Sequence, residues 1–145
     1  MMFRSAIVND ADKLDELLTQ LILDEKKYDP NVEIVKVKDF YKNYINDNTK
    51  FFLVCEENDI IFGYIYVKKE DNILKIDALY VLEEYRNKGI ATHLLEEVIN
   101  YGKLNNYEII SINVLENNLK AKKLYSKYFK LYKKDNIKEE LRMIL

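Results

Sequence analysis

A chain of 145 residues with 48% hydrophobic content is long enough for one domain with a substantial core, and we expect a single domain over residues 1–145. A net charge of −2 with 33% charged residues excludes a strong overall field toward nucleic acid or anionic membranes. A single cysteine excludes an internal disulfide, and no stretch approaches the ~20 apolar residues of a membrane span. These features predict a cytoplasmic protein with no membrane partner.

The N-terminal part of the chain predicts one strand and two helices. Met2–Val8 is an apolar run suited to a strand, and Asn9 or Asp10 can cap the helix that follows. Asp29-Pro30 ends this helix. The aromatic-rich segment from Phe40 to Ile45 predicts a second, shorter helix.

The remainder alternates strands with two further helices. Polar turns separate an antiparallel meander of three strands, Phe51–Glu56, Ile60–Lys68 and Ile73–Val81. A helix follows Gly89 and leads into a buried strand, Tyr107–Leu115, which a right-handed crossover places parallel to Ile73–Val81. Asn117-Asn118 caps a last helix, and Phe129–Tyr132 with Glu139–Leu145 closes the sheet. The expected fold class is mixed α/β, with a twisted, mostly antiparallel sheet of about seven strands and four helices.

The turn between the strand Ile73–Val81 and the next helix is basic and contains one glycine, Gly89. Such a turn can aim several backbone N–H groups at one point, where the helix N-terminus adds partial positive charge. It also lies at the carboxyl end of a strand, where the strand pattern changes direction and ligands bind. We therefore expect a phosphate site here, although neither the P-loop nor the dinucleotide fingerprint is present.

The residues of this turn resemble a known motif. Arg86-x-x-Gly89-x-Ala91, after Leu79-Tyr80-Val81, resembles the acyl-coenzyme A pyrophosphate loop of the GNAT superfamily of N-acetyltransferases. Two further segments resemble the opening and later motifs of that family; they are Arg4-Ser5-Ala6 with Asp10-Ala11, and Asn118…Ala121…Leu124-Tyr125…Phe129. Asn87 and Tyr128 depart from the pattern, because glycine is common at both places, and Tyr128 puts the end of its helix in doubt.

The resemblance implies acetyl-CoA as co-substrate and a GNAT-type fold in which the strands around Val81 splay apart. Backbone amides of the turn, with charge from Arg86 and Lys88, would hold the diphosphate. Leu79 and Val81 would pair with the pantetheine arm, and the Val81 N–H would donate to the oxyanion. The candidate cofactor-binding residues are Leu79, Tyr80, Val81, Arg86, Asn87, Lys88, Gly89, Ile90, Ala91, Thr92 and Asn118.

The resemblance also implies that Tyr125 is the general acid that protonates the departing thiolate; an ordinary core tyrosine is the alternative. For the general base, the position that the family commonly uses falls at Lys75, and Asp77, two residues on and on the same face, is our candidate. Asp77 is equally well explained by a structural pair with a neighbouring lysine, and a bound water could replace a dedicated base.

The remaining reactive side chains do not indicate a second kind of catalytic or binding site. Cys55 follows an apolar run and predicts a buried, inert thiol. His93 lies on the polar side of its helix with no ligand partner at metal-binding spacing, so we expect no metal. The lysine-rich segment from Lys120 to Lys134 predicts a solvated face, some of it near the 3′-phosphate of the coenzyme, and lacks the aromatic residues of a nucleic-acid module.

The leading hypothesis is an N-acetyltransferase acting on a primary amine of a small molecule by direct attack in a ternary complex. The alternatives are a non-catalytic acyl-CoA-binding sensor, a protein lysine or N-terminal acetyltransferase, and a basic nucleic-acid module. Asp24, Glu25 and Asp29 could attract a cationic amine. The acceptor, the acyl-chain preference and a homodimeric state stay open.

Overall fold

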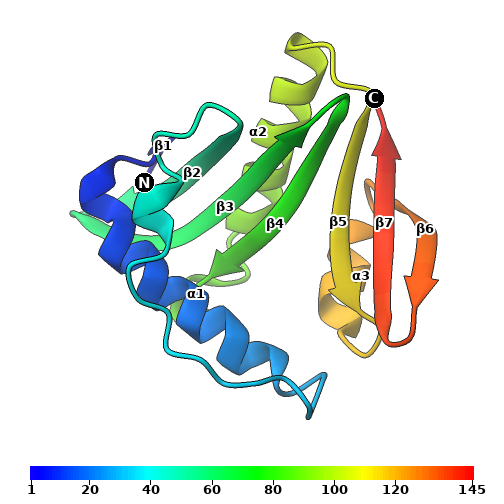
Figure 1. Ribbon diagram of the computed structural model, residues 1–145, viewed down its shortest axis with the longest axis horizontal. Coiled ribbons are helices and arrows are strands. Elements are labelled where there is room, and N and C mark those ends of the chain that lie inside the picture. Colours follow the sequence, from blue (N-terminus) through cyan, green and yellow to red (C-terminus); the bar gives the residue numbers. More distant parts are fainter.

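A seven-stranded sheet forms the frame of the protein (Figure 1). The computed structural model describes residues 1–145. The strand order is β1-β2-β3-β4-β5-β7-β6, and every neighbouring pair is antiparallel except β4 and β5, which are parallel. The strands are β1 (Met2–Ser5), β2 (Lys50–Glu57), β3 (Ile60–Glu70), β4 (Ile73–Val81), β5 (Ile109–Leu115), β6 (Lys130–Asp135) and β7 (Lys138–Ile144). The predicted mixed, mostly antiparallel sheet with one crossover is confirmed.

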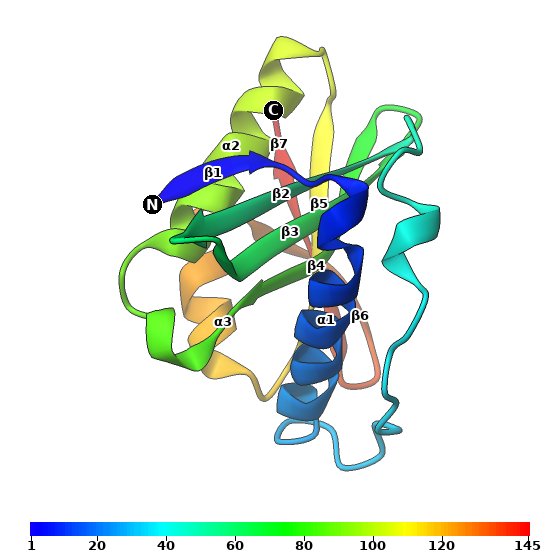
Figure 2. The same ribbon diagram turned by 90° about the vertical axis from the view of Figure 1, so that its left-hand side faces the viewer.

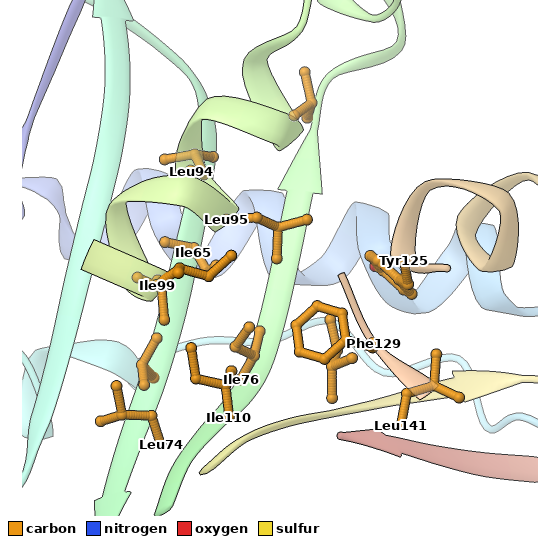
Figure 3. Packing of buried hydrophobic residues seen from close by; sticks show 14 of the residues in the cluster. Ile65, Leu74, Ile76, Leu94, Leu95, Ile99, Ile110, Tyr125, Phe129 and Leu141 are labelled. Carbon is orange, nitrogen blue, oxygen red and sulfur yellow. The ribbon is translucent and has the colours of Figure 1, made fainter. Parts of the chain in front are cut away.

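Three α-helices cover the two faces of this sheet: α1 (Ala11–Glu25), α2 (Ile90–Leu104) and α3 (Leu119–Tyr125). Figures 1 and 2 show α1 on one face, with α2 and α3 on the other. Each face therefore has its own apolar core. Leu14 and Leu17 of α1 pack on an aromatic group from β2 and β3, whereas Leu94, Leu95 and Val98 of α2 pack on the aliphatic residues of β3, β4 and β5. Figure 3 shows this second core.

The predicted helix around Phe40–Ile45 is a single 3₁₀ turn, Tyr41–Asn43, so the chain has three α-helices and not four. The carboxylate of Asp15 on α1 accepts the backbone N–H groups of Tyr41 (3.0 Å) and Phe40 (3.3 Å). The Tyr41 side chain is fully buried, and its hydroxyl lies 2.9 Å from that of Tyr64. Tertiary packing of aromatic rings, and not helical periodicity, thus explains the pattern of this segment.

Two predicted element ends also differ. The first strand ends at Ser5 and not at Val8, because the Asp10 carboxylate accepts the Ile7 N–H (2.8 Å) and turns the chain into a 3₁₀ turn. The last helix ends at Tyr125, before Tyr128, the residue that stands where the family pattern has glycine.

The parallel strands β4 and β5 pair over only half of their length. Their register runs from Ile73–Ile109 to Ile76–Ile112 and then stops, although both strands continue. A β-bulge lies at the same level, since Val67 and Tyr66 of β3 face Ile76 and Ala78 and leave one extra residue, Asp77, on β4. A bulge bends its strand, so β4 turns away from β5 beyond this point, as Figure 1 shows. The splayed pair expected from the resemblance is confirmed.

Candidate functional site

The turn that joins β4 to α2 is held open by two left-handed residues. Asn87 has φ 63° and Gly89 has φ 78°, and Gly89 caps α2 without a side-chain hydrogen bond. Both residue types tolerate this conformation, which most others avoid. Because of it, the backbone N–H groups of residues 87–92 donate to no acceptor within the chain. Six consecutive free N–H groups at a helix N-terminus form an anion-binding arrangement.

The Arg86 side chain is directed away from these N–H groups. Its Nε donates to the Val81 carbonyl (2.7 Å), and its Nη2 donates to Asp24 Oδ2 on α1 (2.9 Å). The guanidinium also lies 5.3 Å from the centre of the Tyr80 ring. In this structure Arg86 therefore braces the end of β4 against α1, and the exposed Lys88 is the cation of the turn that remains without a carboxylate partner.

The free edge of β4 faces the space that the splayed strands leave. The Leu82 N–H donates to the Phe62 carbonyl (2.8 Å), and Val81 stands opposite Gly63. Because hydrogen-bonded and non-bonded pairs alternate in antiparallel strands, the N–H and C=O groups of Leu79 and Val81 point away from β3. Of these, the Val81 carbonyl is bound by Arg86, and the others point between β4 and β5.

A cleft of about 710 Å³ occupies this space. It begins at the turn, passes between the splayed halves of β4 and β5, and is bounded by α3 and by the C-terminal end of α1. Except for Lys88, the cleft brings together all the candidate catalytic and cofactor-binding residues, which are Asp77, Leu79, Tyr80, Val81, Arg86, Asn87, Gly89, Ile90, Ala91, Thr92, Asn118 and Tyr125. Of the acidic residues expected to attract an amine, Asp24 and Glu25 line the cleft and Asp29 does not.

Tyr125 ends α3 and is buried, with its ring edge-on to Phe129 at 6.3 Å between centroids (Figure 3). Its hydroxyl makes no hydrogen bond with any other group of the chain, and because every buried side-chain polar atom has a partner, this oxygen is open to the cleft. Burial raises the pKa of Tyr125 to about 12. The group is therefore protonated at neutral pH and is able to give its proton to a strong base in the cleft.

Asn118 is the N-cap of the same helix. Its Oδ1 accepts a hydrogen bond from the backbone N–H of Ala121 (3.1 Å), so helix capping explains the role of the side-chain oxygen. The residue also lines the cleft and leaves its amide nitrogen without a partner in the chain.

Asp77, the candidate base, is the extra residue of the β4 bulge and lies in the wall of the cleft. Its side chain is 48% exposed, and Oδ1 lies 3.4 Å from Lys68 Nζ on β3. This contact matches the alternative to the general-base role, in which the Asp77 carboxylate forms a structural pair with a neighbouring lysine.

The C-terminal end of α1 contributes residues that the sequence does not place. Asp24, Glu25 and Tyr28 line the cleft, and Asn117 Nδ2 donates to the Tyr28 carbonyl (3.3 Å). Burial raises the pKa of the Glu25 carboxyl. Nothing local in the sequence signals that Asp24 meets a group 62 positions away, or that Tyr28 meets one 89 positions away.

The other reactive side chains lie outside the cleft. Cys55 is buried, and burial raises the pKa of its thiol to about 11. His93 is half-exposed and stacks on Phe3 at 3.8 Å between ring centroids. No group of three or more His, Cys, Asp or Glu side chains is arranged to hold a metal ion. No helix has both the length and the apolar character needed to cross a membrane.

Comparisons with solved structures place this fold among acetyltransferases. A ribosomal-protein-alanine N-acetyltransferase from Brucella melitensis matches with a TM-score of 0.79 and 17% identity over 100% of both chains. PaiA N-acetyltransferase from Thermoplasma acidophilum, in complex with coenzyme A, matches with a TM-score of 0.77 and 18% identity over 99% of this chain and 98% of its own. A Bacillus anthracis protein assigned as a streptothricin acetyltransferase, in complex with acetyl coenzyme A, matches with a TM-score of 0.67 and 22% identity over 74% of this chain and 69% of its own.

At these identities the likeness shows the fold and not the acceptor. No curated protein sequence matches the chain. The model of the acetyltransferase (GNAT) family matches residues 16–130, a segment that includes β4, the turn, α2 and α3. The resemblance to this family is thereby confirmed, and the chain belongs to the GNAT family of acetyltransferases.

Proposed function

We propose that this protein is an N-acetyltransferase that moves an acetyl group from acetyl-CoA to a primary amine by direct attack in a ternary complex. The observation that carries the proposal is the run of six unpaired backbone N–H groups at the start of α2, opening into the same cleft as the unbonded Tyr125 hydroxyl. Two structures with this fold contain coenzyme A or acetyl coenzyme A, which supports the choice of co-substrate.

The turn and the splayed strands would hold the co-substrate. The N–H groups of residues 87–92 bind the diphosphate, and Lys88 adds a positive charge at the surface. The free edge of β4 at Leu79 and Val81 pairs with the amide groups of the pantetheine arm, as a further strand would. Asn118 contacts the arm through the amide nitrogen that helix capping leaves free.

Two groups then act on the thioester. The Val81 N–H, aimed into the space between the strands, donates to the carbonyl oxygen as negative charge develops on it. Tyr125, which is protonated at neutral pH, gives its hydroxyl proton to the departing sulfur, and its position in the cleft suits it to that role. A carboxylate in the cleft takes the proton of the amine, and Asp77 is the group that the sequence puts forward.

The cleft favours a small acceptor. The Asn117–Tyr28 hydrogen bond joins the β5–α3 connection to the segment that follows α1, beside the cleft that Tyr28 lines. A small amine can enter without disturbing this link, whereas the surface around a protein lysine or N-terminus would contact it. Solved structures of this fold carry the names of different acceptors, including a ribosomal-protein alanine, so the fold itself does not choose among them.

The test combines binding with turnover. Isothermal titration calorimetry measures acetyl-CoA binding, and release of free thiol is followed with a panel of small amines, peptides and a protein substrate. We expect binding, and turnover with at least one small amine. Binding without turnover would identify a sensor domain, turnover only with peptides would identify a protein acetyltransferase, and salt-sensitive RNA binding without acetyl-CoA binding would contradict the proposal entirely.

A further inference from the structure

Three carboxylates line the cleft, and two of them have cationic partners. Asp24 Oδ2 lies 2.9 Å from the Arg86 guanidinium, and Asp77 Oδ1 lies 3.4 Å from Lys68 Nζ. Glu25 has neither an ion pair within 4.0 Å nor a hydrogen bond to its carboxylate. Partial burial of a charged carboxylate without a paired cation is unfavourable for folding. A functional role would explain why Glu25 lies in this position.

Glu25 borders the cleft on the face of the sheet opposite to that of Tyr125, the proposed general acid. It is the last residue of α1, which covers one face of the sheet, whereas Tyr125 lies on α3 on the other face (Figures 1 and 2). Both residues line the same cleft, which passes through the sheet where β4 and β5 separate. An acceptor that enters from the α1 face thus meets Glu25 before it reaches the thioester held from the α2 side.

We propose that Glu25 is the general base that takes the proton of the acceptor's ammonium group, an assignment that rests on the proposed function and selects Glu25 over Asp77. The Asp77 carboxylate is paired with Lys68, and its side chain is half-exposed. Glu25 has its full charge available for a primary ammonium group. The preferred acceptor is therefore a primary amine that reaches the cleft in its protonated, cationic form.

The proton and electron balance is complete. The Glu25 carboxylate takes one proton from R–NH₃⁺, and the freed nitrogen lone pair forms the bond to the thioester carbonyl carbon. The C–S bond breaks with its electrons on sulfur, and the thiolate takes the Tyr125 proton. The second N–H proton is lost as the amide forms and, through solvent, restores the Tyr125 hydroxyl, while Glu25 returns its own proton to solvent. The net products are the amide, free coenzyme A and one proton.

The electrostatic surroundings of Glu25 suit this role. Burial is the main cause that raises the pKa of its carboxyl; Lys138 at the start of β7 acts in the opposite direction, and Asp29 in the loop after α1 adds to the rise. Asp24, its neighbour along α1, is already paired with Arg86. A base whose pKa is raised toward the working pH is more effective in proton transfer than an ordinary surface carboxylate.

The test compares pH profiles of kcat and kcat/KM for the wild type, Glu25→Gln, Asp77→Asn and the matched control Glu16→Gln. Glu16 lies on the same helix, with a side chain that is 71% exposed and away from the cleft. We expect Glu25→Gln to lower kcat by ~10²-fold or more and to remove the acidic limb of the kcat/KM profile. Acetyl-CoA affinity by calorimetry is expected to be unchanged in Glu25→Gln, and the Glu16→Gln profile is expected to overlay that of the wild type.

An acidic limb that persists in Glu25→Gln, with kcat near that of the wild type, overturns the assignment, and its loss in Asp77→Asn instead identifies Asp77 as the base. All of these comparisons require that the wild-type protein acetylates at least one amine at a measurable rate. A wild type that binds acetyl-CoA but acetylates no amine overturns the proposed function and this assignment with it, so the two failures are distinguishable.

Discussion

The two sides of the cleft differ in composition, since one is mainly main chain and the other mainly side chains. The proposed cofactor side consists mainly of backbone N–H groups from one stretch, residues 87–92, whose direction depends on the positive φ angles of Asn87 and Gly89. The proposed acceptor side consists of side chains from α1, β4 and β7 that tertiary packing alone brings together. A site made of main chain tolerates many substitutions that keep its φ angles, whereas a site made of side chains changes with each residue. One fold can thus keep its co-substrate while its acceptors differ.

Tyr125→Phe tests the junction of the two sides and has the largest expected effect. Loss of the hydroxyl removes the proton donor to the thiolate, so kcat is expected to fall by ~10²-fold or more while acetyl-CoA affinity stays the same. Thiol-release kinetics and calorimetry measure the two quantities. Tyr128→Phe is the matched control, because its hydroxyl bonds the exposed Glu96 (3.3 Å) outside the cleft. Equal kcat in Tyr125→Phe and the wild type would leave Tyr125 as a core residue.

Gly89→Val tests whether the cofactor side depends on backbone conformation. No atom lies within 4 Å of a Cβ added at Gly89, so the substitution acts through φ alone, which is +78°. A β-branched residue held there costs ~1–3 kcal/mol, and relief of that strain turns the N–H groups away from the diphosphate. We expect acetyl-CoA affinity to fall by ~10-fold or more, since ~1.4 kcal/mol corresponds to tenfold.

Gly89→Asn is the control for this substitution, because asparagine tolerates a left-handed φ, and it is expected to bind acetyl-CoA more tightly than Gly89→Val. If the two variants bind equally well, backbone conformation at Gly89 does not govern the cofactor side.

Asp24→Asn tests a link between the two sides, which runs from α1 through Arg86 to the Val81 carbonyl. Both partners are about one-third exposed, so loss of the ion pair is expected to lower the free energy of unfolding by only ~1 kcal/mol. Urea denaturation at neutral pH measures this change. The more informative readout is the acceptor KM, which is expected to rise, because Arg86 no longer anchors the end of α1. An unchanged unfolding free energy and acceptor KM would show that the brace is not needed.

The pH dependence of stability tests the charge on the acceptor side and has the smallest expected effect. The folded-state pKa of Glu25 is raised above its ordinary value of 4.5, so the protonated form is favoured in the folded protein. Below the unfolded pKa this preference contributes fully to stability, and the contribution is lost as the pH rises through the folded pKa. We expect Glu25→Gln and the wild type to melt alike near pH 4, and Glu25→Gln to melt at a slightly higher temperature at pH 7 and above.

Thermal melts at the two pH values check this prediction. A Glu25→Gln variant that is less stable at pH 7 would show that the carboxylate has a structural partner.

Sequence reasoning was accurate where local chemistry decides the conformation. Ile73–Val81 was predicted as a strand with the bounds that the structure has, and the helix after Gly89 begins at Ile90 as expected. The segment around Tyr41 was wrongly predicted as an α-helix. Its helical hydrogen bonding stops after a single turn, and the N–H groups of Phe40 and Tyr41 are bound by Asp15, more than twenty residues away. The β4 bulge at Asp77 could not be predicted, because it depends on the register with β3.

The order of the elements, the single parallel crossover and the turn with free N–H groups could all be inferred from the sequence, since each depends on patterns within short stretches of the chain. Which carboxylate of the cleft is left without a cation could be seen only in the folded protein, because the partners of Asp24 and Asp77 come from other elements. The direction of the Arg86 guanidinium was decided in the same way. Backbone conformation is set mainly over a few neighbouring residues, whereas the balance of charges in a cleft is set by side chains that meet only when the sheet and its helices have packed.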